Sequence, residues 1–79
     1  MQIGAIPANA SAGSTHCVTV TGVSGVLKVG SRGALKVVSV TQSNVRPSEW
    51  VVCFSLSLGA GVLVAEDGPV SRLTTVRGR

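Results

Sequence analysis

The side chains able to carry acid–base or nucleophilic chemistry are few in this chain. The sequence contains a single histidine, His16, and three acidic residues, Glu49, Glu66 and Asp67. A Ser–His–Asp arrangement could use only His16 and Asp67, and no G-x-S-x-G segment exposes a strained serine nucleophile. A Cys–His pair from His16 and Cys17 is disfavoured as well, because adjacent side chains of a strand point to opposite faces. The sequence therefore predicts no catalytic residue and no enzyme.

Metal and cofactor sites are equally poorly represented. A zinc site needs about four ligands, usually in closely spaced pairs. His16, Cys17 and Cys53 supply three, a carboxylate would have to complete the set, and no C-x-x-C is present. The glycines do not form a phosphate loop, because Lys28 precedes Gly30 instead of following the last glycine. We therefore expect no metal and no cofactor.

Positive charge is the clearest chemical bias of the sequence. Seven Lys and Arg residues stand against three Asp and Glu residues, which gives a net charge of +4. Lys28 and Lys36 occupy matching positions of two similar segments, and Arg32 lies between them. These three side chains predict a modest basic patch that contacts phosphates or an acidic surface without reading a base sequence. The alternative interpretation is that the charge only keeps a small protein soluble.

The elements that must position these side chains have the pattern of strands separated by glycine-rich turns. Period-two alternation puts both aromatic residues on one face of the clearest strand, so this face is predicted to be core. It consists of Trp50, Val52, Phe54, Leu56 and Leu58. Further strands are predicted at residues 17–21, 26–29, 34–41, 62–65 and 70–77. Turns are predicted at residues 30–33, 59–61 and 66–69, and a polar loop at residues 42–49.

These strands predict an all-β fold, a small barrel or sandwich of about six strands. No segment of ten residues shows a helical period with caps. Residues 1–16 are rich in Ala, Gly and Ser, a composition that favours neither helix nor strand, and we expect an extended N-terminal arm there. Residues 17–79 are expected to form a single β-domain.

The core of such a domain is thin. Trp50 and Phe54 are the only aromatic residues, and below roughly 70–80 residues one core seldom contributes more than about 3–5 kcal/mol. We therefore expect a homo-oligomer, for instance a trimer, which buries apolar residues that a single chain leaves exposed. The candidate interface residues lie in the arm and in the strand at 34–41: Ile3, Ile6, Pro7, Val38 and Val40.

Cys17 and Cys53 each lie in a Val-rich segment. The default expectation is two free, buried thiols, which behave as small hydrophobic side chains, and a disulfide between them is the alternative. The N-terminus lacks the charged and Leu-rich regions of a signal peptide. The longest uncharged stretch after residue 27, residues 50–65, is shorter than the about 20 apolar residues of a membrane-spanning helix. No membrane association is expected.

An uncharged, small-residue arm followed by a short Val/Thr/Ser/Gly β-domain resembles small bacteriophage virion proteins, especially the capsid decoration (cement) proteins. The resemblance implies a non-enzymatic structural protein that resides in the virion after assembly in the host cytoplasm. It also implies that residues 1–16 clamp a major capsid or other virion protein, while residues 17–77 form the cluster of copies.

Two alternatives stay open at this point. A small basic SH3-like or OB-like β-barrel that binds RNA or DNA would use Lys28, Arg32 and Lys36. A fragment of a tail fibre or spike would form an obligate trimer without any capsid. An assembly protein should remain oligomeric in high salt, whereas phosphate binding weakens steeply as salt increases.

Overall fold

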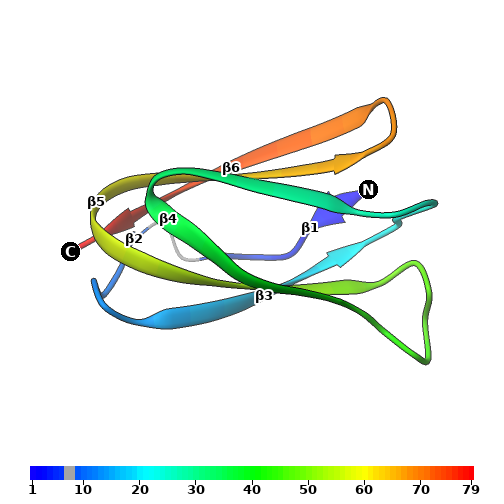
Figure 1. The fold of residues 1–79 in the computed structure, drawn as a ribbon, viewed down its shortest axis with the longest axis horizontal. Helices are drawn as coiled ribbons and strands as arrows, with labels where there is room; N and C mark the ends of the chain where they lie inside the picture. The colour runs from blue at the N-terminus through cyan, green and yellow to red at the C-terminus, as the bar shows by residue number, and fades with distance from the viewer. Residues whose placement is uncertain (7–8) are drawn as a thin grey trace.

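The computed structural model describes residues 1–6 and 9–79, and these residues contain strands and no helix. In chain order the strands are β1 (Gln2–Ile3), β2 (Asn9–Ala10), β3 (Thr15–Thr21), β4 (Lys28–Gln42), β5 (Trp50–Asp67) and β6 (Val70–Gly78). The prediction of an all-β fold with about six strands is confirmed. All six belong to one strongly curled sheet, which encloses the core like half of a barrel (Figure 1).

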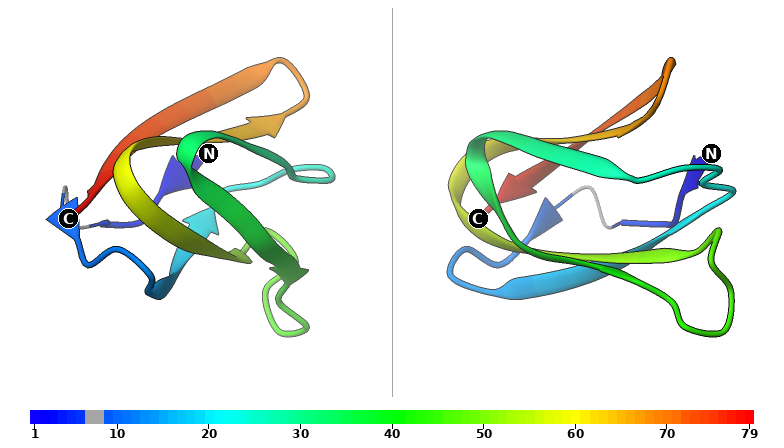
Figure 2. Two further views of the ribbon diagram at one scale, coloured as in Figure 1. Left: turned by 60° about the vertical axis from the view of Figure 1, so that its left-hand side comes forward. Right: turned by 45° about the vertical axis from the view of Figure 1, so that its right-hand side comes forward.

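The centre of the fold is the long antiparallel hairpin of β4 and β5, which bends sharply in the middle. The first part of β5 pairs with β3, and the second part pairs with β6. β4 follows β5 on both sides of the bend. The result is two three-stranded layers that diverge from the bend and face each other (Figures 1 and 2).

Glycines produce this bend. Gly33 has a φ of +66° and lies opposite Gly61. After Gly33 the partner of β4 changes from Gly61 to Leu56, so several residues of β5 bulge out at the bend. The predicted turns at residues 30–33 and 59–61 are therefore wrong, because both strands continue through these segments. The glycines do change the direction of the backbone. Because Gly33 and Gly61 lie opposite each other, however, both strands bend at the same place and neither reverses.

The apolar core fills the space between the two layers. Its largest fully buried side chains are Phe54, Leu56, Leu63, Val20, Val52 and Val76. The predicted core face of β5 is confirmed at Val52, Phe54 and Leu56, and Trp50 is half-buried. Leu58 is the exception: it is 77% exposed because β5 begins to bend just after Leu56.

The described residues of the N-terminal segment, 1–6 and 9–14, lie along the body of their own chain. β1 pairs antiparallel with β3 in one layer, and β2 pairs parallel with the end of β6 in the other layer. The described parts on either side of residues 7–8 thus pair with strands of opposite layers (Figure 2). Ile3 and Ile6, expected to anchor on a neighbouring molecule, pack here against the core of the same chain. Pro7 lies outside the described residues.

The connections follow the predicted turn chemistry more closely. Residues 43–49 form the loop between β4 and β5, as predicted. The β5–β6 connection is a two-residue turn at residues 68–69, within the predicted span. Gly68 has a φ of +59°, as the first central position of a type II′ hairpin turn requires.

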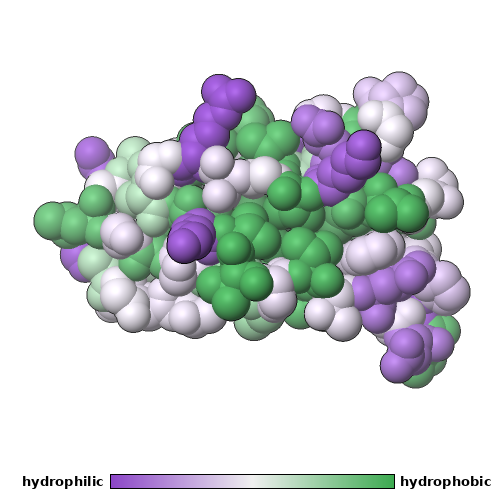
Figure 3. Space-filling model, viewed as in Figure 1, coloured by the Kyte–Doolittle hydropathy of each residue, from purple (hydrophilic) through white to green (hydrophobic). Residues whose placement is uncertain are grey.

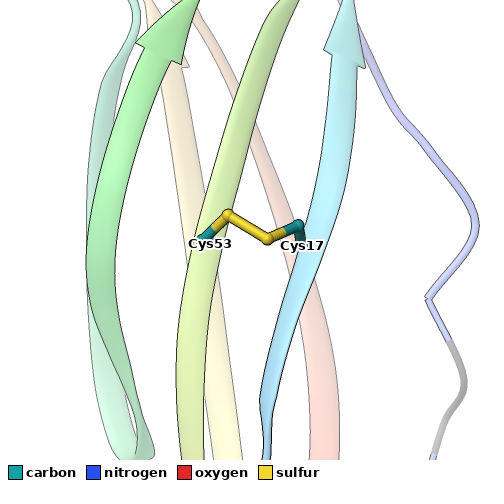
Figure 4. The surroundings of a disulfide bond; sticks show 2 residues. All are labelled: Cys17 and Cys53. Carbon is teal, nitrogen blue, oxygen red and sulfur yellow. A yellow bond between two sulfur atoms is a disulfide. The ribbon is translucent and has the colours of Figure 1, made fainter.

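Cys17 and Cys53 form a disulfide across β3 and β5 (Figure 4). The antiparallel register places the two residues directly opposite each other, with a Cα–Cα distance of 4.0 Å. Cys17 is exposed and Cys53 is half-buried on the outer face of the layer. The expectation of two free, buried thiols is therefore wrong, and the alternative that the sequence left open is correct.

Candidate functional site

A shallow depression on the outer face of the β4–β5–β6 layer brings two of the predicted basic residues together. Lys28, Arg32, Val64 and Glu66 line it, and its volume is about 310 Å³. Lys28 lies opposite Glu66 and Arg32 lies opposite Val62 in the β4–β5 register. Gly30 lies between the two cations, and no atom occupies the space where a side chain would begin. The depression therefore offers two cations, one carboxylate and an apolar floor.

Lys36 does not belong to this depression. It lies beyond the bend of β4, where it pairs with Ser55 on the outer face of the other layer. The pattern that suggested three cations on one face assumed a hairpin turn at residues 30–33. Because β4 instead bends at Gly33, the layer that carries Lys28 and Arg32 is not the layer that carries Lys36.

Aromatic side chains do not contribute to this surface. Phe54 is fully buried in the core, and Trp50 is half-buried and packs against the core. Proteins that bind single strands without sequence preference stack bases on exposed aromatic rings. The chemistry that the depression offers to a nucleic acid is therefore contact with phosphate groups.

His16 is hydrogen-bonded to Ser14, which in turn contacts the backbone of Ser11. The Ser14 hydroxyl donates its only proton to the carbonyl oxygen of Ser11, which can only accept. The Ser14 oxygen also lies within hydrogen-bond distance of His16 Nε2, at 2.7 Å. These contacts connect residues 11, 14 and 16 at the start of β3. The His16 ring also packs on Phe54, with ring centroids 5.9 Å apart.

Asp67, the other residue considered for a triad, is engaged elsewhere. Its carboxylate accepts from the Ser24 backbone N–H at 2.9 Å, from Ser24 Oγ at 3.1 Å and from the Gly25 N–H at 3.1 Å. The Ser24 backbone hydrogen bond is the main cause that lowers the pKa of Asp67, and the Ser24 hydroxyl and Gly25 N–H act in the same direction. These hydrogen bonds satisfy the buried carboxylate of Asp67. They also join the end of β5 to the connection between β3 and β4.

The three candidate zinc ligands do not form a metal site. Cys17 and Cys53 are bonded to each other, so neither thiolate is free to coordinate a metal. Within residues 1–6 and 9–79, no group of three or more His, Cys, Asp or Glu side chains is placed to hold a metal ion.

Apolar side chains are exposed on both layers and in the loops. Figure 3 shows apolar surface across the middle of the face that β4 crosses. The most exposed large hydrophobic residues are Val45 (86%), Leu58 (77%), Val26 (74%), Leu73 (67%) and Val38 (61%). Among the predicted interface residues, Val38 is exposed at a register shift of β4, whereas Val40 packs against the core.

Sequence reasoning did not predict the exposure of Leu58 and Leu73. Leu58 continues the alternation of a buried face, so its position in the sequence signalled burial. Leu73 lies between Arg72 and Thr74 in the last strand, and that polar context was the available signal for an exposed residue.

No helix among the described residues has the length and apolarity needed to cross a bilayer. Comparison with protein-family models, with characterised proteins and with solved structures finds no match for this chain.

Proposed function

We propose that this chain is a non-enzymatic structural protein of a virus particle, of the capsid decoration type. It assembles with copies of itself and with a major capsid or other virion protein. The observation that carries the proposal is the exposure of large apolar side chains, among them Leu58, Leu73 and Val38, on so small a body. A large apolar patch on a small protein typically marks a surface that another protein covers, and Figure 3 shows apolar surface across the face that β4 crosses.

Each contact in such an assembly contributes a modest free energy, and the contributions of many contacts add up. Burying apolar surface contributes about 25 cal/mol per Å², so each exposed Leu or Val adds a fraction of the affinity. Repeated contacts in an array then hold the copies together even where a single contact is weak. The chain of 79 residues with a net charge of +4 also carries little charge that would have to be desolvated at such contacts.

The test is the solution mass of the purified chain, measured by light scattering at about 0.05 and 1 M salt, where the Debye length falls to about 3 Å. The proposal expects an oligomer that persists at both salt concentrations, because apolar contacts are not screened. A folded monomer at both salt concentrations would overturn it. An oligomer that dissociates only in high salt would also contradict it, since charge would then hold the copies together.

A second candidate function, binding to nucleic-acid phosphates, is favoured by the depression that Lys28 and Arg32 line around Gly30. Lys28→Ala/Arg32→Ala removes both cations, and Lys36→Ala/Arg46→Ala removes the same charge outside the depression. We expect labelled duplex DNA to bind the first variant more weakly, with a salt slope lower by about 1 for each lost phosphate contact. Equal binding of the two variants would exclude the depression as the site.

A further inference from the structure

We infer that the free edge of β6 pairs with the same edge of a second copy of this chain, antiparallel and centred on Leu73. The inference deepens the proposed self-assembly, on which it rests, by naming the surface through which two copies meet. It starts from the observation that β6 pairs with β5 along its whole length but with β2 only at its end, at Arg77 and Gly78.

The direction of the backbone groups on β6 follows from its contact with the N-terminal segment. The N–H of Arg79 donates to Ala10 O, and the carbonyl of Arg79 accepts from the Ala12 N–H. Residues of one strand alternate in the edge to which their N–H and C=O groups point, and β6 has no register shift that would break the alternation. The backbone groups of Ser71, Leu73 and Thr75 therefore point to the same edge, where no described strand receives them.

The geometry of the free edge selects one register. The turn at residues 68–69 ends the edge on one side, and the pairing of Arg77 with β2 ends it on the other. The free stretch, residues 70–76, has Leu73 at its midpoint. An antiparallel pair that uses the whole stretch must therefore place its two-fold axis at Leu73, with Ser71 opposite Thr75 of the second copy.

The residues in this register are self-complementary. Leu73, which is 67% exposed, meets its own symmetry mate, and Ser71 meets the hydroxyl of Thr75. Arg72 lies opposite Thr74 of the second copy, so no two cations oppose each other. The three pairs formed by Ser71, Leu73 and Thr75 can exchange two backbone hydrogen bonds each.

Space for a second strand is present beside this edge. A groove of about 470 Å³ is lined by residues 72–74 of β6 and residues 1–4 at the N-terminus, and the Arg72 side chain reaches across it to donate from Nε to the Met1 carbonyl oxygen at 3.5 Å. In Figure 2 the margin of β6 is the outer border of its layer, with the N-terminal segment on the inner side. A strand that extends this layer outward can therefore approach β6 without replacing β1.

The other long edge of the sheet is less suited to self-pairing. The outer edge of β4 carries Lys28, Arg32 and Lys36, and the strand has two register shifts, next to Gly33 and at Val38. Lysines and bulges on an edge strand oppose edge-to-edge pairing. The edges of β4 and β6 thus differ in a feature that opposes pairing, and β6 is the better suited of the two to accept a second copy.

The register is tested by placing charges at the two residues that oppose each other across the axis. In Ser71→Lys/Thr75→Lys, lysine faces lysine twice across the dimer, whereas in Ser71→Lys/Thr75→Glu, lysine faces glutamate twice. Sedimentation equilibrium over about 10 µM to 1 mM should show a dimer for the wild type. The Lys/Glu variant should keep it, and the Lys/Lys variant should dissociate at least about tenfold more readily. Asn44→Lys/Ser48→Lys adds the same two charges at exposed polar residues of the loop between β4 and β5, and it should leave the dimer intact.

A second variant tests the backbone hydrogen bonds directly. Leu73→Pro removes an N–H that points to the free edge and leaves the β5–β6 hydrogen bonds in place, a position where edge strands tolerate proline. We expect a monomer with an unchanged strand signal in circular dichroism.

The outcomes separate the two proposals. A wild-type chain that stays monomeric to 1 mM overturns both the proposed function and this pairing. A wild-type oligomer that the Lys/Lys variant leaves intact, or that the Asn44→Lys/Ser48→Lys control weakens equally, overturns the β6 pairing alone.

Discussion

Asp67 at the end of β5 and Ser24 in the connection between β3 and β4 are joined by two hydrogen bonds, although 43 residues separate them in sequence. The carboxylate accepts from both the backbone N–H and the hydroxyl of Ser24, and its second oxygen accepts from Gly25. β3 belongs to one layer and the second part of β5 to the other. This contact therefore ties the two layers together at the end away from the bend.

The first prediction concerns the pH dependence of stability. The Ser24 backbone N–H is the main cause that lowers the pKa of Asp67, so the ionised carboxylate is more favourable in the folded chain than in the unfolded chain. Its contribution is fully present above the unfolded pKa of about 3.9 and is lost as the pH falls through the lowered pKa. Thermal melts between about pH 5 and pH 2 should show this loss in the wild type.

Asp67→Asn is the matched variant, because it keeps the size of the side chain and removes its titration. We expect a lower melting temperature than that of the wild type at pH 6, since an amide NH₂ cannot accept the bonds from Ser24 and Gly25. The difference between the two proteins should shrink in acid. If the two melting curves fall in parallel from pH 5 to pH 2, another carboxylate dominates the acid transition.

The second prediction addresses the glycines at the bend. A Cβ added at Gly61 would lie 2.5 Å from the Cβ of Leu35, whereas one added at Gly30 meets nothing within 4 Å. Gly61→Ala should therefore cost about 1–3 kcal/mol through overpacking, and Gly30→Ala should be neutral or slightly stabilising. Urea denaturation of both variants checks this. Equal stabilities would mean that β4 and β5 do not approach each other so closely at the bend.

The third prediction concerns the disulfide. It closes a loop between residues separated by 36 positions, and a bridge of this span typically stabilises a protein by about 2–4 kcal/mol. Cys17→Ser/Cys53→Ser should lower the unfolding free energy by that amount. Because Cys17 is exposed, a small reductant should open the bridge in the folded wild type without denaturant. Thiol titration of the native protein measures this, and thiols that appear only on unfolding would contradict the observed exposure.

The fourth prediction separates the core from the exposed apolar surface on one strand. Phe54 is fully buried and Leu58 is 77% exposed. Phe54→Ala should cost about 3–5 kcal/mol through the cavity it leaves, whereas Leu58→Ala should change stability by less than about 0.5 kcal/mol. Chemical denaturation of the dilute chain measures both. A large cost at Leu58 would show that β5 continues its buried face through the bend.

Several features were predictable from the sequence because they depend on neighbouring residues alone. The alternation at residues 50–58 predicts a strand and the burial of Val52, Phe54 and Leu56, although it also predicts the burial of Leu58, which is exposed. Gly68 with Pro69 predicts the hairpin turn. Glycine marks a place where the backbone can change direction, and the bend at Gly33 is such a place. Composition and alternation were thus sufficient for an all-β fold, although four of the predicted strands merge into β4 and β5 and the short strands β1 and β2 were not predicted.

Pairing between distant residues was decided by the tertiary structure. The sequence does not contain the register that puts Cys17 opposite Cys53, or Gly33 opposite Gly61, because a register depends on contacts between segments that local patterns do not encode. The same pairing turned two expected reversals into one bend, placed Lys36 on a different layer from Lys28 and Arg32, and exposed Leu58. Local backbone preference is a property of a few neighbouring residues and determined the strands; the packing of whole strands around one core determined which side chains meet on the surface.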